Sequence, residues 1–252
     1  FKVSAVEFSC KFIQGSFILG KTKPGSKVEV DNKEVKVSKD GYFAFGLSRE
    51  RKNNIIIKVF KDKKLEVFEK KVFKRKYKIQ RIDGLPEKKV TPPKEVYERI
   101  KNENKIIGDA RAIDSNLTFF KNKFIKPLDN AIVTGVYGSQ RILNGKPKWP
   151  HYGIDFAAKE GTKIKAMLDG TATMVEPDLF YTGGTLIFDH GHGISTLYMH
   201  MKDIYVEKGQ KVKQGDTIGT VGSTGRSTGP HLDVRLNWFN VRLDPGTVLD
   251  LN

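Results

Sequence analysis

Hydrophobic and polar side chains alternate with a period of two along the N-terminal part of the chain, and pairs of turn-forming residues interrupt the alternation. This pattern is typical of short β-strands joined as hairpins, because side chains in a strand point alternately to opposite faces. The turn pairs are Asp31-Asn32 and Asp40-Gly41, and the hydrophobic runs lie at 28–30, 35–37, 43–45, 55–59 and 65–72. About seven strands in roughly 70 residues predict a small antiparallel sandwich of immunoglobulin-like shape over residues 1–79.

A second β pattern, with dense glycine-rich turns, covers residues 124–252. The turns fall at Asp169-Gly170, Gly183-Gly184, 191–193 and Gly215-Asp216. The runs between them lie at 171–175, 185–188, 195–199 and 234–236. We therefore expect a mainly β protein whose C-terminal domain is built from antiparallel hairpins.

Residues 80–123 join the two β regions and differ from both. The segments Gly84-Leu85-Pro86 and Pro92-Pro93 predict a stiff connector. The segment from Pro93 to Asp114 is predicted to be a helix, because its hydrophobic residues recur close to one face. We expect this helix to pack on one of the two domains.

Positive charge is concentrated in the N-terminal third. The 252 residues carry 45 Lys and Arg against 29 Asp and Glu, a net charge of +16, and residues 1–92 contribute +13 of it. A basic surface attracts polyanions such as nucleic acid, anionic lipid, teichoic-type polymers or acidic glycans, and a merely solvated face is the alternative. No recognised nucleic-acid-binding motif accompanies the charge, so no specific nucleic-acid partner is expected.

The hydrophobic fraction of 38% excludes wholesale disorder. No uncharged stretch reaches the roughly 18 residues that a membrane-spanning helix needs, so no transmembrane segment is expected. The chain begins at Phe1 and not at Met, from which we expect a mature product whose export signal was removed upstream. Cys10 is the only cysteine, which excludes an intrachain disulfide, and its flank does not resemble a lipid-attachment site.

All five histidines lie between residues 151 and 231, which points to a site in the C-terminal domain. His151 and Asp155 are four residues apart, but Pro150 and Gly153 argue against a helix there. His151 is therefore predicted on a loop and Asp155 on the strand that follows. On these residues alone, a structural His–Asp pair explains the spacing as well as a pair of metal ligands does.

Two further histidines belong to strands. His200 ends an apolar run, and His231 and Asp233 are two residues apart, so both face the same side of a strand. The glycine-rich loop 222–229 leads into His231. We reject it as a nucleotide-binding loop, because it lacks the Gly-Lys-Ser/Thr ending and the strand-to-helix context.

Three segments together resemble peptidase family M23, the LytM/lysostaphin-type zinc metallopeptidases that cut peptidoglycan. They are HYGIDFAA, which begins at His151, GGTLIFDHGHGISTLYMH, which ends at His200, and VKQGDTIGTVGSTGRSTGPHLD, which ends at Asp233. The resemblance covers about half of the chain, from residue 125 onward, and implies a LytM-type antiparallel β domain. The N-terminal third resembles the accessory domains of exported relatives only loosely.

The resemblance also implies a Zn²⁺ cofactor and the roles of five residues. His151, Asp155 and Asp233 occupy the positions of the family's three metal ligands, and His200 and His231 those of its two non-ligand catalytic histidines. One of these histidines would take a proton from water during amide hydrolysis, and the other would help to stabilise the oxyanion. The sequence leaves open which of His200 and His231 takes which of these two roles.

Position 233 departs from the family pattern, because Asp233 stands where the second His of the H-x-H motif is expected. A carboxylate can ligate zinc at about 2.0–2.2 Å, so coordination is not excluded. Two carboxylates and one neutral His cancel the formal charge of Zn²⁺, and we therefore expect a weaker Lewis acid. The domain is identified as a lineage variant of the family.

Other residues are weaker candidates. Tyr137 and Arg141 resemble the family's residues at the groove entrance and are candidate substrate contacts, although a structural salt bridge is an alternative for Arg141. His190 and His192 are predicted in a tight turn between strands. Trp149 and Trp238 are predicted to be packing residues rather than platforms for sugars.

Two functions therefore compete. The first is a zinc-dependent endopeptidase of the periplasm or cell envelope that hydrolyses peptidoglycan cross-links of the D-Ala–diaminopimelate type. The second, motivated by Asp233, is a catalytically weak or inactive factor that binds peptidoglycan and activates or positions other cell-wall hydrolases. In both, the basic N-terminal domain would hold an exported protein near an anionic envelope.

Overall fold

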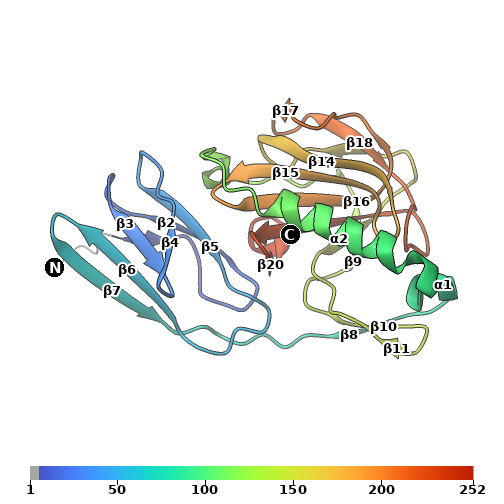
Figure 1. Ribbon diagram of the computed structural model, residues 1–252, viewed down its shortest axis with the longest axis horizontal. Coiled ribbons are helices and arrows are strands. Elements are labelled where there is room, and N and C mark those ends of the chain that lie inside the picture. Colours follow the sequence, from blue (N-terminus) through green and yellow to red (C-terminus); the bar gives the residue numbers. More distant parts are fainter. Residues whose placement is uncertain (1–5, 252) are drawn as a thin grey trace.

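The computed structural model describes residues 6–251 and shows two β domains joined by a connector (Figure 1). The predicted mainly β architecture is confirmed. The N-terminal domain lies on the left of Figure 1, and the C-terminal domain lies on the right.

Two antiparallel sheets form the N-terminal domain, in the orders β1-β2-β5 and β4-β3-β6-β7. A buried cluster that includes Ile18, Phe43 and Ile57 forms its core. Asp31 and Asn32 both have positive φ, 49° and 63°, as the two-residue hairpin turn between β3 and β4 requires. The strands are β1 (Glu7–Phe8), β2 (Phe17–Lys21), β3 (Lys27–Val30), β4 (Lys33–Val35), β5 (Tyr42–Gly46), β6 (Ile55–Lys61) and β7 (Lys64–Lys70).

The predicted hairpins are therefore present in the N-terminal domain. Its likeness to an immunoglobulin domain stays a prediction, as do the domain boundaries after residues 79 and 123.

A ten-stranded antiparallel sheet forms the C-terminal domain. Its main path runs β17-β14-β15-β16-β19-β12-β9, while β13 and β18 pair with each other, β18 also pairs with β16, and β20 pairs with β19. Phe188, Tyr198 and Leu232 lie fully buried in its core. The strands are β9 (Ile132–Gly135), β12 (Ile154–Ala157), β13 (Lys163–Lys165), β14 (Gly170–Leu179), β15 (Gly183–Gly191), β16 (Ile194–Ile204), β17 (Lys211–Val212), β18 (Thr217–Val221), β19 (His231–Trp238) and β20 (Val241–Leu243).

The connector contributes both a strand and the main helix. Strand β8 (Ile79–Ile82) pairs in parallel with β10 (Gln140–Leu143), which pairs in turn with β11 (Lys146–Pro147). Helix α2 (Tyr97–Arg111) packs on the C-terminal sheet, where Ala110 joins a buried cluster with Met174 and Leu197. The remaining helical segments are α1 (Glu87–Val90) and the 3₁₀ turns η1 (Lys94–Val96), η2 (Phe119–Lys121) and η3 (Pro245–Thr247).

The predicted helix is thus present but shorter than the segment from Pro93 to Asp114. The 3₁₀ turn η1 follows Pro93 and precedes the α-helix, which begins only at Tyr97. In Figure 1, α2 crosses the face of the C-terminal domain. Among residues 6–251, no helix combines the length and the hydrophobicity that a membrane crossing requires.

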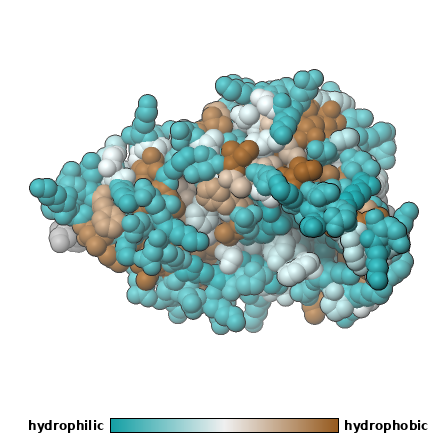
Figure 2. Space-filling view, in the orientation of Figure 1, coloured by the Kyte–Doolittle hydropathy of each residue, from teal (hydrophilic) through white to brown (hydrophobic). Residues whose placement is uncertain are grey.

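The two domains share a packed interface. Phe17 and Ala44 of the N-terminal domain belong to the core cluster of the C-terminal domain. The Arg75 guanidinium lies 2.6 Å from a carboxylate oxygen of Asp244, which is largely buried. The connector strand β8 is held beside the C-terminal domain by its own pairing with β10. Hydrophilic side chains cover most of the face seen in Figure 2, with smaller hydrophobic patches between them.

Candidate active site

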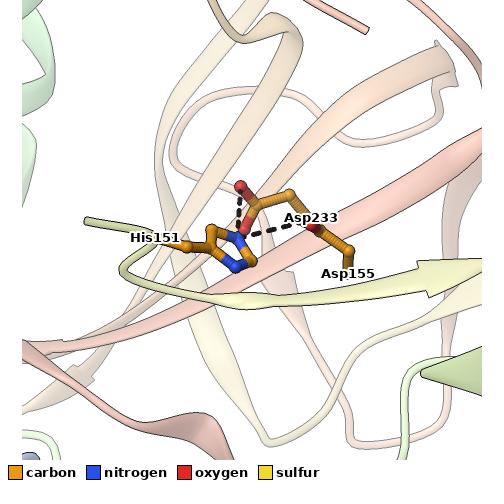
Figure 3. A group of neighbouring side chains, drawn as sticks. All are labelled: His151, Asp155 and Asp233. Atoms are coloured by element: carbon orange, nitrogen blue, oxygen red, sulfur yellow. Dashed lines mark hydrogen bonds and ion pairs between the residues drawn. The ribbon is translucent and has the colours of Figure 1, made fainter. Parts of the chain in front are cut away.

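Three side chains from separate parts of the C-terminal domain converge. His151 lies in the loop before β12, Asp155 lies in β12, and Asp233 lies in β19. The antiparallel register places Asp155 directly opposite Asp233, so both carboxylates leave the same face of the sheet. Figure 3 shows both carboxylates turned toward the His151 imidazole, whose Nε2 lies 3.1 Å from Asp155 Oδ1 and 3.3 Å from Asp233 Oδ2.

This arrangement fits a metal ion. One donor atom of each residue lies within 4.8 Å of the other two, and all three residues are buried. Asp155 Oδ1 is buried with the His151 ring beside it, and the buried Nδ1 of His151 has no hydrogen-bond partner among the described residues. An imidazole nitrogen and two carboxylate oxygens are ligands that zinc accepts, and three protein ligands leave a coordination position free. The residues predicted as ligands are therefore the ones that the fold brings together.

Two glycines make room for the carboxylates. A Cβ on Gly135 would lie 2.2 Å from Asp155 Oδ2, and a Cβ on Gly153 would lie 2.2 Å from Asp233 Oδ1. A Cβ on Gly153 would also lie 2.6 Å from the carbonyl oxygen of Val234. This oxygen belongs to the backbone, so it cannot rotate away as a side chain can. A side chain at either position would displace a candidate ligand.

Each carboxylate is also paired with an arginine. Arg141 Nη2 lies 2.6 Å from Asp155 Oδ2, and Arg235 Nη2 lies 3.0 Å from Asp233 Oδ2. Burial alone would raise the pKa of Asp233, but Arg235 and His151 outweigh it and hold that pKa well below its usual value. The sequence-based charge count omitted both arginines. With them, the charges around a bound Zn²⁺ would sum to a positive value, while the weaker Lewis acidity expected from Asp233 stays a prediction.

His200 and His231 form the opposite part of the site, with ring centroids 4.6 Å apart. Nδ1 of His200 lies 2.8 Å from the Thr224 carbonyl oxygen, and Nδ1 of His231 lies 2.8 Å from the Gly229 carbonyl oxygen. A carbonyl only accepts, so each Nδ1 carries the proton and donates it. Nε2 is therefore the ring nitrogen that each histidine has left for accepting a proton.

Burial and the neighbouring His231 lower the pKa of His200 to about 4, so this ring is neutral at neutral pH. His200 also has a positive φ of 63°, which is uncommon for a residue with a side chain. It stands where β16 changes partners, because Met199 pairs with Asp233 in β19 and Met201 pairs with Val221 in β18. His200 therefore lies at an irregular point of β16, from which its ring lines the groove of the site.

A groove of about 320 Å³ opens over these residues. Asp155, His200 and His231 line one part of it, and the loop 226–230 lines another. The connector supplies a wall that the sequence did not predict, because Gln80, Ile82 and Leu85 also line the groove. Gln80 Oε1 accepts a hydrogen bond of 3.3 Å from Arg141 Nε, which links the connector to the Arg141–Asp155 pair.

Sequence reasoning also missed Arg235, although one signal was available. Arg235 follows Asp233 by two residues on β19, and residues at that spacing share a face. No comparable local signal identified Gln80, because its place in the groove follows from the parallel pairing of β8 with β10, over 50 residues away in the chain.

Three weaker predictions need correction. Tyr137 is only 2% exposed and its hydroxyl donates to the Arg242 carbonyl, so a direct contact with substrate does not fit its position. His190 lies within β15 and is fully buried; its Nδ1 donates to the Asp169 carbonyl and its Nε2 accepts from the Thr196 hydroxyl. Trp149 is 83% exposed and is not a packing residue. Arg141 forms the predicted alternative, a salt bridge, and also lines the groove.

Comparison with known proteins gives a consistent result. Residues 149–245 match peptidase family M23. The peptidoglycan DD-endopeptidase ShyA of Vibrio cholerae is 44% identical over 87 residues, which are 34% of this chain and 20% of that protein. The peptidoglycan DD-endopeptidase ShyC of the same organism is 36% identical over 138 residues, which are 54% of this chain and 31% of that protein. The matches thus span less than a third of either relative.

A solved structure has the same fold over nearly the whole chain. It is the crystal structure of a putative M23 peptidase from Pseudomonas aeruginosa, with a TM-score of 0.72, 24% identity and 95% of both chains covered. The family match contains His151, Asp155, His200, His231 and Asp233. Residues 149–245 of this chain therefore form a domain of peptidase family M23.

Proposed function

We propose that this protein is a zinc-dependent peptidoglycan endopeptidase that hydrolyses peptide cross-links in the cell wall, of the D-Ala–diaminopimelate type. The observation that carries the proposal is the convergence of His151, Asp155 and Asp233 opposite two histidines, in an open groove. The names of ShyA and ShyC support the substrate class.

The residues of the site have separate roles in the proposed reaction. His151, Asp155 and Asp233 would hold zinc, which when bound supplies Lewis acidity toward a peptide carbonyl and a water molecule. His200 and His231 line the groove and use Nδ1 to donate to backbone carbonyls, which leaves Nε2 of either ring to accept a proton from water and return it to the departing amine. Arg141 and Arg235 orient the two carboxylates and stabilise their ionised forms.

The direct test incubates the zinc-loaded protein with purified sacculi and measures cross-linked muropeptides by chromatography. We expect the wild-type protein to lower the amount of cross-linked muropeptides. We expect His151→Ala and Asp155→Asn to leave that amount unchanged. Asp62→Asn is the matched control, because it removes an exposed carboxylate in the N-terminal domain and should leave cleavage unchanged. Equal cleavage by wild type and His151→Ala would contradict the proposal.

The second candidate function is a non-cleaving factor that binds peptidoglycan and activates or positions other cell-wall hydrolases. The observation that favours it is the pairing of both carboxylates with arginines, which compete with a metal ion for the same oxygens. Zinc content separates the two functions, because a protein that binds peptidoglycan but takes up no zinc would fit only the second.

Both functions place the protein in the periplasm or cell envelope, with peptidoglycan as its partner. The net charge of +13 over residues 1–92 supports attraction to an anionic envelope. Binding to sacculi in low salt should therefore weaken when exposed lysines of the hairpin between β6 and β7, such as Lys63 and Lys64, are replaced with Glu. Unchanged binding would count against this role of the basic domain.

A further inference from the structure

A second cavity, of about 730 Å³, adjoins the groove and shares Arg141, Leu143 and Arg226 with it. This volume lies within the range of ligand pockets. Its lining is strongly basic, and no acidic residue belongs to it among residues 6–251. The cationic residues that line it are Arg111, Arg141, Lys148, Arg226, Arg235 and Arg242. We call this space the arginine cavity.

Most of this charge has no counter-ion. Arg141 and Arg235 pair with Asp155 and Asp233, as described above. The other three arginines of the lining form no ion pair with any residue in the described part of the chain. They are Arg111 of α2, Arg226 of the groove loop and Arg242 of β20.

Arg111 carries the clearest sign of a missing partner. Arg111 is only 7% exposed, and its Nε and Nη1 atoms are buried with no hydrogen-bond partner among the described residues. Its Nη2 makes one long hydrogen bond of 3.4 Å to Asn240. Burial and neighbouring arginines lower the pKa of Arg111 to about 10 and that of Arg242 to about 9. Burying an unpaired cation is costly, so an anionic ligand would relieve this arrangement.

Aromatic rings hold two of the guanidinium groups in place. Arg226 lies 4.6 Å from the ring centroid of Tyr181, and Arg242 lies 5.5 Å from that of Tyr152. Both tyrosines line the cavity, as does the exposed Trp149. A stacked guanidinium keeps its N–H fork oriented, which suits bidentate binding of a planar carboxylate.

We propose that the arginine cavity binds a free carboxylate of the peptide whose neighbouring amide bond lies in the groove. The proposal rests on the proposed function and deepens it, because the peptides of a diaminopimelate cross-link carry free carboxylates close to the bond that is cut. The cavity adjoins the groove through Arg141 and Arg226, so one peptide can occupy both spaces. The ligand is thus an acidic peptide, and its carboxylate is recognised separately from the metal.

Binding can be measured without hydrolysis. The probe is a synthetic stem peptide, L-Ala–γ-D-Glu–diaminopimelate–D-Ala, and its partner is the same peptide with all carboxylates converted to carboxamides. Titration of the metal-free protein by calorimetry should give an affinity at least about tenfold higher for the acidic peptide, the scale of one charged hydrogen bond. Arg111→Gln and Arg242→Gln should each remove most of this preference.

The control is Lys101→Gln, which removes an exposed charge from the same helix as Arg111 and should retain the wild-type preference. Arg111→Gln should also keep or raise the melting temperature, because it removes a buried unpaired charge. A merely structural arginine would show the reverse, with a lower melting temperature and an intact preference.

Equal affinities for the two peptides would overturn the proposal, and so would an unchanged preference in Arg242→Gln. Inorganic phosphate binding as tightly as the acidic peptide would show a small-anion site and would also overturn it. The proposed function fails separately. If sacculi are not cleaved while the preference persists, the arginine cavity stands without the endopeptidase. If cleavage occurs with no preference, only the cavity assignment fails.

Discussion

Replacing Arg235 with Gln removes the guanidinium that pairs with Asp233 while leaving a polar side chain on the same face of β19. Asp233 is 1% exposed and would then keep His151 as its one remaining ion-pair partner among residues 6–251. Breaking a buried ion pair by removing one partner costs about 3–5 kcal/mol. Because His151 remains, we expect the metal-free protein to lose roughly 2–3 kcal/mol of unfolding free energy.

The same substitution should strengthen zinc binding. Arg235 and a zinc ion would share one carboxylate, and a unit charge and a divalent ion about 4 Å apart repel by roughly 8 kcal/mol at an effective dielectric constant of about 20. Reorganisation of the freed carboxylate offsets part of this gain, so we expect an affinity at least about tenfold higher, or roughly 1.4 kcal/mol. Urea denaturation of the metal-free protein and competition with a chromophoric chelator measure the two effects.

The opposite signs distinguish this account from simple damage to the fold, which would weaken both properties. Arg99→Gln is the matched control, because Arg99 pairs with Glu103 and Asp178 at the surface of α2. It should change stability by no more than about 0.5 kcal/mol and leave zinc affinity unchanged. Weaker zinc binding by Arg235→Gln, or unchanged stability of its metal-free form, would refute the reasoning.

Three further predictions concern the site and its surroundings. Gly153→Ala should lower zinc affinity about tenfold or more in a chelator competition, because its Cβ would displace Asp233; wild-type affinity would show that the loop adapts. His200→Asn should lower the cleavage rate at least about 100-fold while zinc content is retained, and equal rates would exclude His200 from proton transfer. Burial lowers the pKa of both His190 and His200 to about 4, so the unfolded chain binds more protons between about pH 6.5 and 4. The contribution of these two histidines to the unfolding free energy should therefore be fully present above pH 6.5 and decrease as the pH drops toward 4, by up to about 1.4 kcal/mol per pH unit for each histidine. Urea denaturation measures this change, and an unfolding free energy that stays constant over this range would contradict the prediction.

The strands and hairpins could be predicted because their signals are local. Alternation and turn pairs such as Asp31-Asn32 depend on neighbouring residues, and the structure confirms them. The start of α2 at Tyr97 could not be predicted, because a 3₁₀ turn and an α-helix share the same sequence pattern over one turn.

The candidate site was predictable only in part. The spacing of His231 and Asp233 on one strand gave part of it, and the family resemblance gave the rest of the ligand set. The ion pairs of Arg141 and Arg235 escaped notice, because a charge count by residue type contains no information about which charges meet. The connector wall around Gln80 depends on a pairing between distant segments, which only the folded chain reveals.

The most direct test of the central claim is the zinc stoichiometry of the purified protein, measured by mass spectrometry of the metal after chelator treatment, reloading and removal of free zinc. The account predicts one zinc ion per chain for the wild type and for the surface control Asp62→Asn, and none for His151→Ala. No zinc in the wild type, or one zinc ion in His151→Ala, would contradict a metal centre built from His151, Asp155 and Asp233.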